Sequence, residues 1–568
     1  MSRRSSISKQ VSRAIAPALL WGVLSLGMAV NAFAACQGPG APTNTQTKCL
    51  TAIPLPFPIS SFDISYVNPD RGEYYLGDRS SKAIDVIDTN RLVYVRSVGS
   101  DKPFTGNVLN AAGTAVNNSS AGPAGVVTRG RWLYAGDGNS TLHVIDLDDA
   151  SASPTKQVIA TGGQFRLDEM ALTGDGTLLI AANNADDPPF ATLFNANGDA
   201  QTSNVSIITK ILIDNSIVPS GYGLGIEQPA WDPRTQRFYT SVPIMANNPP
   251  GCNYGQLSGP TTCSGGLLIS DPKNPTAIQG AYDPIKNVGV LPLNSCGPNG
   301  ASMGPNGNIM LGCTPGNFPA GVTTLILNTK TKNYTNLSGI WGSDEVWYNS
   351  GDNRYYTGSS GQPVKPGVTT TSRGSVFGVV DGSSILIESI PVSSGTHSIA
   401  ADSKRNLIFV PMIRTTGPTA IPVGDQNFTG AINNSPTVSQ LTCGTSDGCI
   451  AVYKSGANVD SDGGSQGTPS AQLVDNNTGA NSTLTVGDTF TFMITGAQPF
   501  SLVHVSETTA VQGFSVPVYS ADVGYTDGSG SFSLTGAVTS NLIGTWQQTW
   551  TAGGVPVQPT PITFSVSK

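Results

Sequence analysis

A short unit of apolar and polar positions recurs seven times between residues 63 and 409. Each unit opens with one lead residue, runs through a short apolar strand and a turn, and continues into a second, apolar and aromatic strand. Aromatic and β-branched runs bounded by Gly, Asn and Asp predict strands. The seven lead residues are Asp63, Gly122, Asp168, Glu227, Asn299, Asp344 and His397.

A third apolar strand that ends in a turn residue follows in each unit, from residues 83–88 in the first to residues 450–453 in the last. A unit repeated at this length indicates a radial or linear array. Seven copies of a roughly four-stranded unit can close into a ring, which removes exposed sheet edges. We therefore expect a seven-bladed β-propeller over residues 35–455, with residues 50–58 supplying the outer strand of the last unit. An open β-solenoid is the alternative, although solenoid repeats are shorter and need no closure.

The pattern changes after the last unit. Residues 456–471 are rich in Gly, Ser, Asp and Asn, which predicts a linker. Short alternating strands return over residues 472–568, and about a hundred residues of this pattern are typical of an immunoglobulin-like β-sandwich. The predicted fold class is therefore all-β, with a propeller followed by a small sandwich.

The first 34 residues predict a signal peptide, because positive charges precede an apolar run and Ala32-Phe33-Ala34 matches a cleavage site. A lipoprotein is the alternative, since Cys36 follows closely, but lipidation there would leave an odd thiol. The eight cysteines indicate disulfides in an exported protein of the periplasm, cell surface or extracellular space. They fall into local couples: Cys36 with Cys49, Cys252 with Cys263, Cys296 with Cys313, and Cys443 with Cys449.

The composition limits which classes of partner we expect the protein to bind. Glycine (66 residues) and proline (40) are frequent and charged residues make up only 12%, as expected for turn-rich extracellular β proteins. The net charge of −7 and the lack of a basic stripe argue against nucleic acid. No second apolar run is long enough for a transmembrane anchor. A small molecule, or an extracellular glycan or protein, remains as the expected partner.

The lead residues are candidates for a shared site. In a propeller the innermost strands line a central channel, so equivalent lead residues should meet at one mouth. Six of the seven are polar, and crowded carboxylates raise one another's pKa unless a cation intervenes. Calcium or magnesium would suit such oxygen ligands, and manganese or zinc would fit if His397 joins. Alternatively these side chains only cap turns, although Glu227 and His397 are poor turn formers.

Two segments carry a family resemblance. Glu227-Gln-Pro-Ala-Trp-Asp232 resembles the Glu-Gly/Ser-Pro-x-Trp opening of the senescence-marker-protein/gluconolactonase family. Pro298-Asn-Gly300, followed by Pro-Asn-Gly at 305–307, resembles that family's Asn-Gly strand and next turn. The resemblance implies a divalent metal held by Glu227, Asn299 and Asp344, with Asp344 also a general base in lactone hydrolysis. That family has six blades, whereas the seven units here are more similar to YVTN-type surface propellers.

Two functions follow as hypotheses. The first is a secreted metal-dependent hydrolase acting on a lactone or related ester, with Asp63 as a further metal ligand. The cation would polarise the carbonyl and lower the pKa of a bound water, and Asp344, His397 or Asp168 would accept the proton. The second is a non-catalytic cell-envelope binding or adhesion module that uses the propeller rim. Fold alone does not decide between them.

Overall fold

The structure is a computed structural model in which a defined part of the chain is described. The predicted signal peptide and most of the predicted linker lie outside that part. The described residues are Cys36, 47–221, 225–246, 248, 252–253, 256–257, 264–294, 296–313, 324–337, 339–340, 342–363, 373–413, 442–444, 446–455, 469–497, 502–511, 514–525, 531–552 and 555–568.

Up to residue 455 the described strands form seven antiparallel sheets and one short hairpin. In six of the sheets the four main strands follow chain order. Those strands are β2 (Phe62–Asn68), β3 (Glu73–Asp78), β4 (Ala83–Asp88), β5 (Val93–Val98); β6 (Val126–Arg129), β7 (Trp132–Gly136), β8 (Thr141–Asp146), β9 (Thr155–Ala160); β10 (Met170–Leu172), β11 (Leu178–Asn183), β12 (Phe190–Asn195), β13 (Ser206–Ile213); β14 (Pro229–Asp232), β15 (Arg237–Val242), β18 (Gly265–Ser270), β20 (Gly289–Leu293); β21 (Pro298–Met303), β22 (Asn308–Cys313), β23 (Thr324–Asn328), β24 (Tyr334–Leu337); β25 (Ser343–Asn349), β26 (Arg354–Pro363), β27 (Arg373–Asp381), β28 (Leu386–Val392). The short β19 (Ile278–Gln279) adds to β13 in parallel, and β16 (Cys252–Asn253) pairs with β17 (Gln256–Leu257).

The seventh sheet joins the two ends of this region. It contains β29 (Ala400–Asp402), β30 (Leu407–Met412), β31 (Cys449–Ser455) and, as its outer strand, β1 (Thr47–Pro54). β1 comes from ahead of the first unit, as expected, but it spans residues 47–54 instead of 50–58. Pairing of an N-terminal strand with the last sheet fastens the two ends of the array together.

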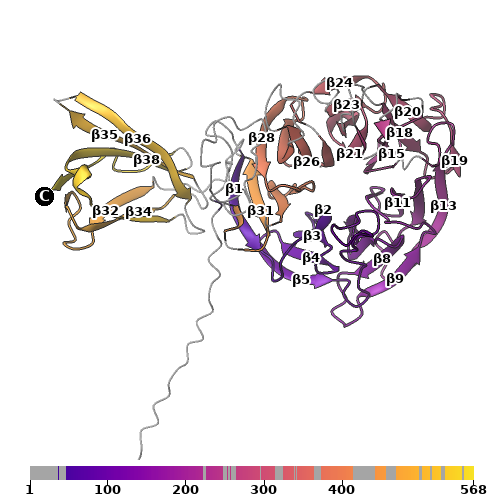
Figure 1. Ribbon diagram of the computed structural model, residues 1–568, viewed down its shortest axis with the longest axis horizontal. Coiled ribbons are helices and arrows are strands. Elements are labelled where there is room, and N and C mark those ends of the chain that lie inside the picture. The colour runs from indigo at the N-terminus through magenta and orange to yellow at the C-terminus, as the bar shows by residue number, and fades with distance from the viewer. Residues whose placement is uncertain are drawn as a thin grey trace, which may run out of the picture. The chain divides into compact units, whose positions relative to one another are not determined.

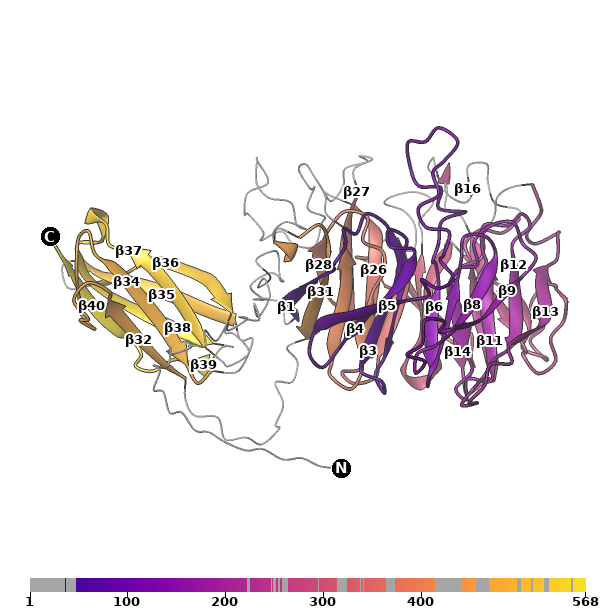
Figure 2. The ribbon, with the colours of Figure 1, turned by 90° about the horizontal axis from the view of Figure 1, so that it is seen from below.

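The sheets stand around a central axis, as Figure 1 shows and as the side view in Figure 2 confirms. Their innermost strands contact one another in succession (β2, β6, β10, β14, β21, β25, β29), and β29 contacts β2 again. Apolar side chains fill the space between neighbouring sheets; Tyr239 and Leu267 of one pack with Ile309 and Leu311 of the next. Both faces of a sheet are therefore buried, which explains why the second strands are continuous apolar runs and do not alternate. The arrangement is consistent with the blades of a β-propeller.

The C-terminal region forms two further sheets around their own apolar core. One contains β32 (Ser470–Asp475), β34 (Thr489–Thr495) and β37 (Phe532–Ala537). The other contains β33 (Thr483–Thr485), β35 (Leu502–Val511), β36 (Phe514–Tyr525), β38 (Gly544–Ala552), β39 (Val555–Pro556) and β40 (Ile562–Ser567). Phe492 of the first sheet stacks on Trp550 of the second, with ring centroids 3.7 Å apart. Because this region has no cysteine, packing of this kind holds the two sheets together.

The described elements include two 3-10 turns, η1 (Pro305–Gly307) and η2 (Ser540–Leu542). Disulfides join Cys36 to Cys49, Cys296 to Cys313, and Cys443 to Cys449, as the local couples predicted. The remaining couple lies partly outside the described residues. Such disulfides indicate an oxidising, exported environment, and none of the described helices has the length and apolarity to cross a bilayer.

Candidate active site at the channel mouth

Three lead residues lie at irregularities of the innermost strands. The register with the second strand shifts between Phe62 and Ser65 in β2, between Pro298 and Ala301 in β21, and between Ser343 and Glu345 in β25. Asp63, Asn299 and Asp344 fall within these shifts. A bulge of this kind re-aims a side chain relative to the regular pleat, so the backbone itself singles out these positions.

The other three polar leads come just before their strands. The backbone N–H of Asp168 donates to the carbonyl of Ala182 over 2.7 Å, and that of Glu227 donates to the carbonyl of Ser241 over 2.9 Å. The carbonyl of His397 accepts from the N–H of Glu345 in the preceding sheet over 3.3 Å. Each lead is thus fixed by backbone hydrogen bonds, either to its own second strand or to a neighbouring sheet.

Asp63 lies in a cationic group that sequence reasoning did not anticipate. Its buried carboxylate forms an ion pair with Arg79 and lies 3.7 Å from Nη1 of Arg166. On the other side, Nε2 of His397 is 3.3 Å from Oδ1 of Asp63. The His397 ring stacks on Phe62, and its Nδ1 lies 2.7 Å from the carbonyl oxygen of Gly395. Only a proton on Nδ1 allows that contact, because a carbonyl accepts.

These contacts set opposite pKa shifts. Burial alone would raise the pKa of Asp63, but the charges of Arg79 and Arg166 outweigh it, and the pKa falls well below its usual range. Burial alone would lower the pKa of His397, but the bond to Asp63 and the charges of Asp344 and Asp63 raise it to about 9. His397 is therefore an imidazolium at neutral pH.

Asn184 connects two further leads. Its Nδ2 donates to Oδ2 of Asp168 over 2.7 Å and to Oε2 of Glu227 over 3.3 Å. Its Oδ1 accepts from Nε of Arg166 over 3.0 Å, and Nη2 of Arg166 lies 2.7 Å from the same Oδ2 of Asp168. A continuous network thus runs from His397 through Asp63, Arg166, Asp168 and Asn184 to Glu227.

Several buried oxygen atoms at the mouth lack hydrogen-bond donors within the described residues. Asn299 donates through Nδ2 to Oδ1 of Asp344 over 3.3 Å. Its own buried Oδ1 has no hydrogen-bond partner within the described residues, nor do Oδ1 of Asp168 and both carboxylate oxygens of Glu169. Burial, followed by the charges of Asp168, Glu227, Asp344 and Glu345, raises the pKa of Glu169 well above its usual value. These side chains therefore share one electrostatic environment.

Two carboxyl groups titrate near neutral pH. Burial raises the pKa of Asp168 to about 7, even though the charge of Arg166 opposes the shift. Burial likewise raises the pKa of Glu345 to about 8, against hydrogen bonds from the Ser398 hydroxyl and the Ile399 N–H. A group with a pKa near the working pH can both accept and release a proton.

Gly122, the apolar lead, adds no side chain to the mouth. A Cβ there would lie 2.1 Å from Oδ1 of Asp137, so the position requires glycine. The preceding loop contributes instead: Asn118 accepts from Nη1 of Arg79 through its side-chain oxygen over 2.6 Å and from Nη1 of Arg166 through its backbone carbonyl over 3.2 Å. The loop thereby orients both arginines.

The predicted metal ligands are not equally suited to bind a cation. The orphaned Oδ1 of Asn299 beside Asp344 is the kind of acceptor that a hard cation would satisfy. Asp63 is already paired with two guanidinium groups, whose charges disfavour a cation there, so its role as a ligand stays a prediction. Among the described residues, no group of three or more His, Cys, Asp or Glu is arranged to hold a metal ion.

The structure thus brings all six polar leads into hydrogen bonds, ion pairs or mutual electrostatic influence. Sequence reasoning missed Arg79, Arg166, Asn184, Glu169 and Glu345. Two signals could have found some of them. Arg79 and Asn184 both stand sixteen positions after a lead, directly after their second strands, and Asp-Glu pairs occupy both 168–169 and 344–345.

The fold and the site define an all-β, propeller-type protein. Its channel mouth is charged and contains buried oxygens that have no hydrogen-bond partner within the described residues. No family model and no curated protein matches the chain. Similar solved structures include hydrazine synthase of Kuenenia stuttgartiensis, at 10% identity and a TM-score of 0.42, covering 63% of this chain and 92% of that one. Others are a luciferin-regenerating enzyme (10%, TM-score 0.31, 59% and 95%) and the calcium-binding protein regucalcin of Agrobacterium tumefaciens (8%, TM-score 0.29, 70% and 90%). These likenesses are too distant to assign an activity or a cation to this chain.

Proposed function

We propose that this protein is an exported, seven-bladed propeller with a C-terminal immunoglobulin-like sandwich, and that it hydrolyses a lactone or related ester at the channel mouth with the help of a divalent cation, calcium in the first instance. One observation carries the proposal. Four buried acceptor oxygens, on Asp168, Glu169 and Asn299, lack a donor within the described residues. Buried acceptors of this kind are costly unless a proton, a water or a cation satisfies them.

Glu227, Asn299 and Asp344 would hold the cation, since carboxylate and amide oxygens are the ligands that calcium and magnesium prefer. When bound, the cation would polarise the substrate carbonyl and acidify water. Asn184 would keep the Glu227 carboxylate in place.

Proton transfer is assigned to Asp168. Its pKa of about 7 and its unpartnered Oδ1 suit a general base that takes a proton from water as the water oxygen adds to the carbonyl carbon. The same carboxyl group can then protonate the leaving oxygen as the acyl C–O bond breaks. His397 has a pKa of about 9 and both ring nitrogens engaged, so it suits a fixed positive charge better than a base. A catalytic role of Asp344 remains secondary to metal binding.

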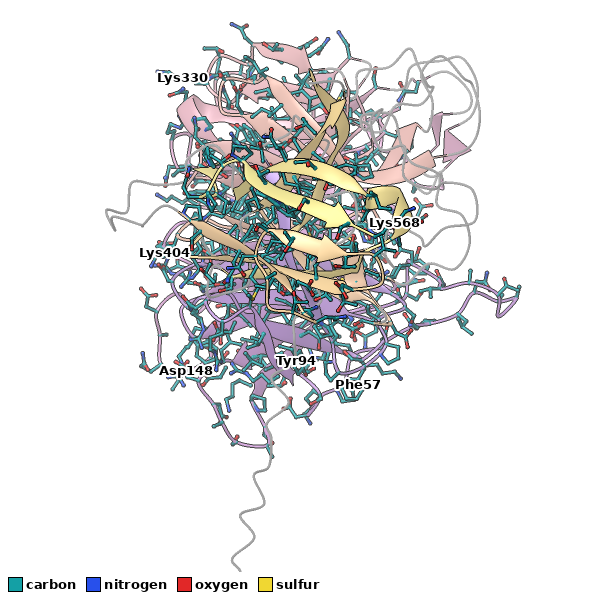
Figure 3. The ribbon with its side chains drawn as sticks, turned by 90° about the vertical axis from the view of Figure 1, so that its left-hand side faces the viewer. Phe57, Tyr94, Asp148, Lys330, Lys404 and Lys568 are labelled. Atoms are coloured by element: carbon teal, nitrogen blue, oxygen red, sulfur yellow. A yellow bond between two sulfur atoms is a disulfide. The ribbon has the colours of Figure 1, made fainter. Side chains whose placement is uncertain are left out.

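The test combines metal analysis with turnover. Elemental analysis of the purified mature protein should find about one divalent ion per chain, and Glu227→Gln should lose it together with hydrolysis of a lactone panel. Lys404→Gln is the matched control, since that lysine lies on the surface (Figure 3), paired with Asp70. A wild-type protein that hydrolyses no member of the panel when saturated with calcium, magnesium, manganese or zinc would exclude the hydrolase.

A non-catalytic binding module is the second candidate, with an extracellular glycan or protein as partner. It is favoured by the two arginines, which already neutralise Asp63 and Asp168 without any cation. Under this function, thermal stability would be the same with and without chelator, and the Glu227→Gln variant would retain partner binding.

A further inference from the structure

A recess separate from the channel-mouth residues lies where the loop after β5 meets strands β8 and β9. Its volume is about 460 Å³, and Lys102, Asp137, Asn139, His143 and Lys156 are among the residues that line it. None of these side chains has a part in the proposed hydrolysis.

The hydrogen-bond acceptors around this recess are already used within the protein. The Asp137 carboxylate accepts from the N–H and hydroxyl of Thr105, over 3.0 and 2.8 Å, and from the N–H of Gly138 over 2.7 Å. Oε1 of Gln157 accepts from the N–H of Val205 over 2.9 Å. A ligand that must be recognised through its own donors would find few free acceptors here.

Donors, by contrast, remain open. The exposed Lys102 ammonium and the Asn139 amide nitrogen have no partner within the described residues, although Oδ1 of Asn139 accepts from Thr141. Lys156 is held at the edge by Asp149 and by the carbonyl of Ser153. Free donors and an exposed positive charge favour a ligand that is negatively charged and rich in hydrogen-bond acceptors.

His143 adds a buried, unsatisfied group to the recess. Its side chain is only 4% exposed, it stacks on Phe104 with centroids 4.2 Å apart, and its Nδ1 has no partner within the described residues. Nε2 faces Oδ2 of Asp137 at 3.9 Å, which favours a hydrogen on Nε2 and leaves Nδ1 for a ligand. A buried histidine nitrogen without a partner calls for an explanation.

We propose that this recess binds a small oxyanion, a carboxylate or phosphate group, through the Lys102 ammonium, the Asn139 amide and Nδ1 of His143, which takes up a proton as the anion enters. Uptake of the proton converts Nδ1 from an acceptor into a donor and gives the anion a buried cationic partner. The charges of Asp137 and Asp101 then stabilise the imidazolium.

The electrostatics of the free protein agree with this coupling. Burial lowers the pKa of His143, and the charges of Asp137 and Asp101 only partly oppose the shift. The imidazole is therefore neutral before the ligand arrives.

The experiment uses imidazole NMR of the full-length mature protein, which is practicable because the chain has only three histidines. The signal that His143→Gln removes is the one to follow, with inorganic phosphate and acetate as probes at constant ionic strength. Millimolar phosphate or acetate should move this signal and raise its titration midpoint, and binding should be tighter at acidic than at alkaline pH. Lys102→Gln should weaken binding about fivefold, the upper end for an exposed ion pair, while Lys404→Gln should not.

The responses of the His143 signal to the different anions test the proposal. A response to phosphate alone identifies a phosphate group as the ligand, and a response to both probes identifies any small oxyanion. If the signal does not move with either probe, or moves equally in wild type and Lys102→Gln, the recess is not an anion site. An equal response to chloride overturns the proposal too, because it reports ionic strength alone.

Discussion

His397 should keep its proton until about pH 9. The bond from Nε2 to Asp63 and the nearby charge of Asp344 outweigh the burial that would otherwise lower its pKa from 6.5. A shift from 6.5 to about 9 corresponds to about 3 kcal/mol of preference for the imidazolium in the folded protein, at 1.36 kcal/mol per pKa unit. The side chain is only 20% exposed, so solvent screening removes little of this.

The sign of the linkage follows from the direction of the shift. Because the pKa is raised in the folded state, the stabilisation is fully present below the unfolded pKa of 6.5 and is lost as the pH rises through about 9. The difference in unfolding free energy between wild type and His397→Gln should therefore fall by about 3 kcal/mol across this window. Denaturant unfolding at both ends of the window measures it.

A direct check is the imidazole titration itself. The NMR signal that His397→Gln removes should have a midpoint near 9 in wild type. In Asp63→Asn, which keeps the shape of the side chain but loses its charge, the midpoint should move toward 6.5. Retention of the native amide spectrum is the control for folding. A wild-type midpoint near 6.5, or one that Asp63→Asn leaves in place, would refute the assignment of Asp63 as the partner.

Further predictions concern other parts of the chain. Asn184→Ala should cut turnover and shift the pH profile, because it frees the two carboxylates that Asn184 bridges; circular dichroism checks the fold. Glu169→Gln, assayed with chelator, should raise the thermal midpoint, and the gain should grow as the pH rises above 4.5, because the raised pKa of this buried carboxyl costs stability there. Trp550→Ala should destabilise the C-terminal sheets by about 3–5 kcal/mol, measured by denaturant unfolding of the tryptophan and circular dichroism signals. Ala52→Pro should cost about 1–3 kcal/mol in the propeller region, because it removes a backbone N–H from the β1–β31 ladder; differential scanning calorimetry measures it.

The register of the repeats predicted which lead residues influence one another at the channel mouth. Because equivalent positions of a circular array face the same axis, the slots of Asp63, Asp168 and Asp344 were enough to expect their mutual influence without any knowledge of loops. The same symmetry explains the continuous apolar second strands, since each sheet is covered on both faces by its neighbours.

The register could not predict which residues from outside the innermost strands contact the lead residues. Arg79 and Asn184 come from the ends of second strands, and Asn118 comes from a loop whose path no repeat constrains. The repeats therefore did not predict the guanidinium groups beside Asp63, and Asp63 was expected to bind the cation. The proton on His397 was equally hidden, because its pKa depends on which of these groups lies beside it.

The charged groups at the channel mouth form two parts, which differ in how they would interact with a cation. Around Asp63, the three cations of Arg79, Arg166 and His397 outnumber the two carboxylates that they contact, those of Asp63 and Asp168. Around Asn299 and Glu169, buried oxygens have no described donor at all. A divalent cation would be repelled by the first part and attracted by the second, so it should bind on the side of Asn299 and leave Asp63 untouched. A substrate between the two parts would then have one oxygen polarised by the cation and another facing the imidazolium, which distinguishes this mouth from a simple acidic ring.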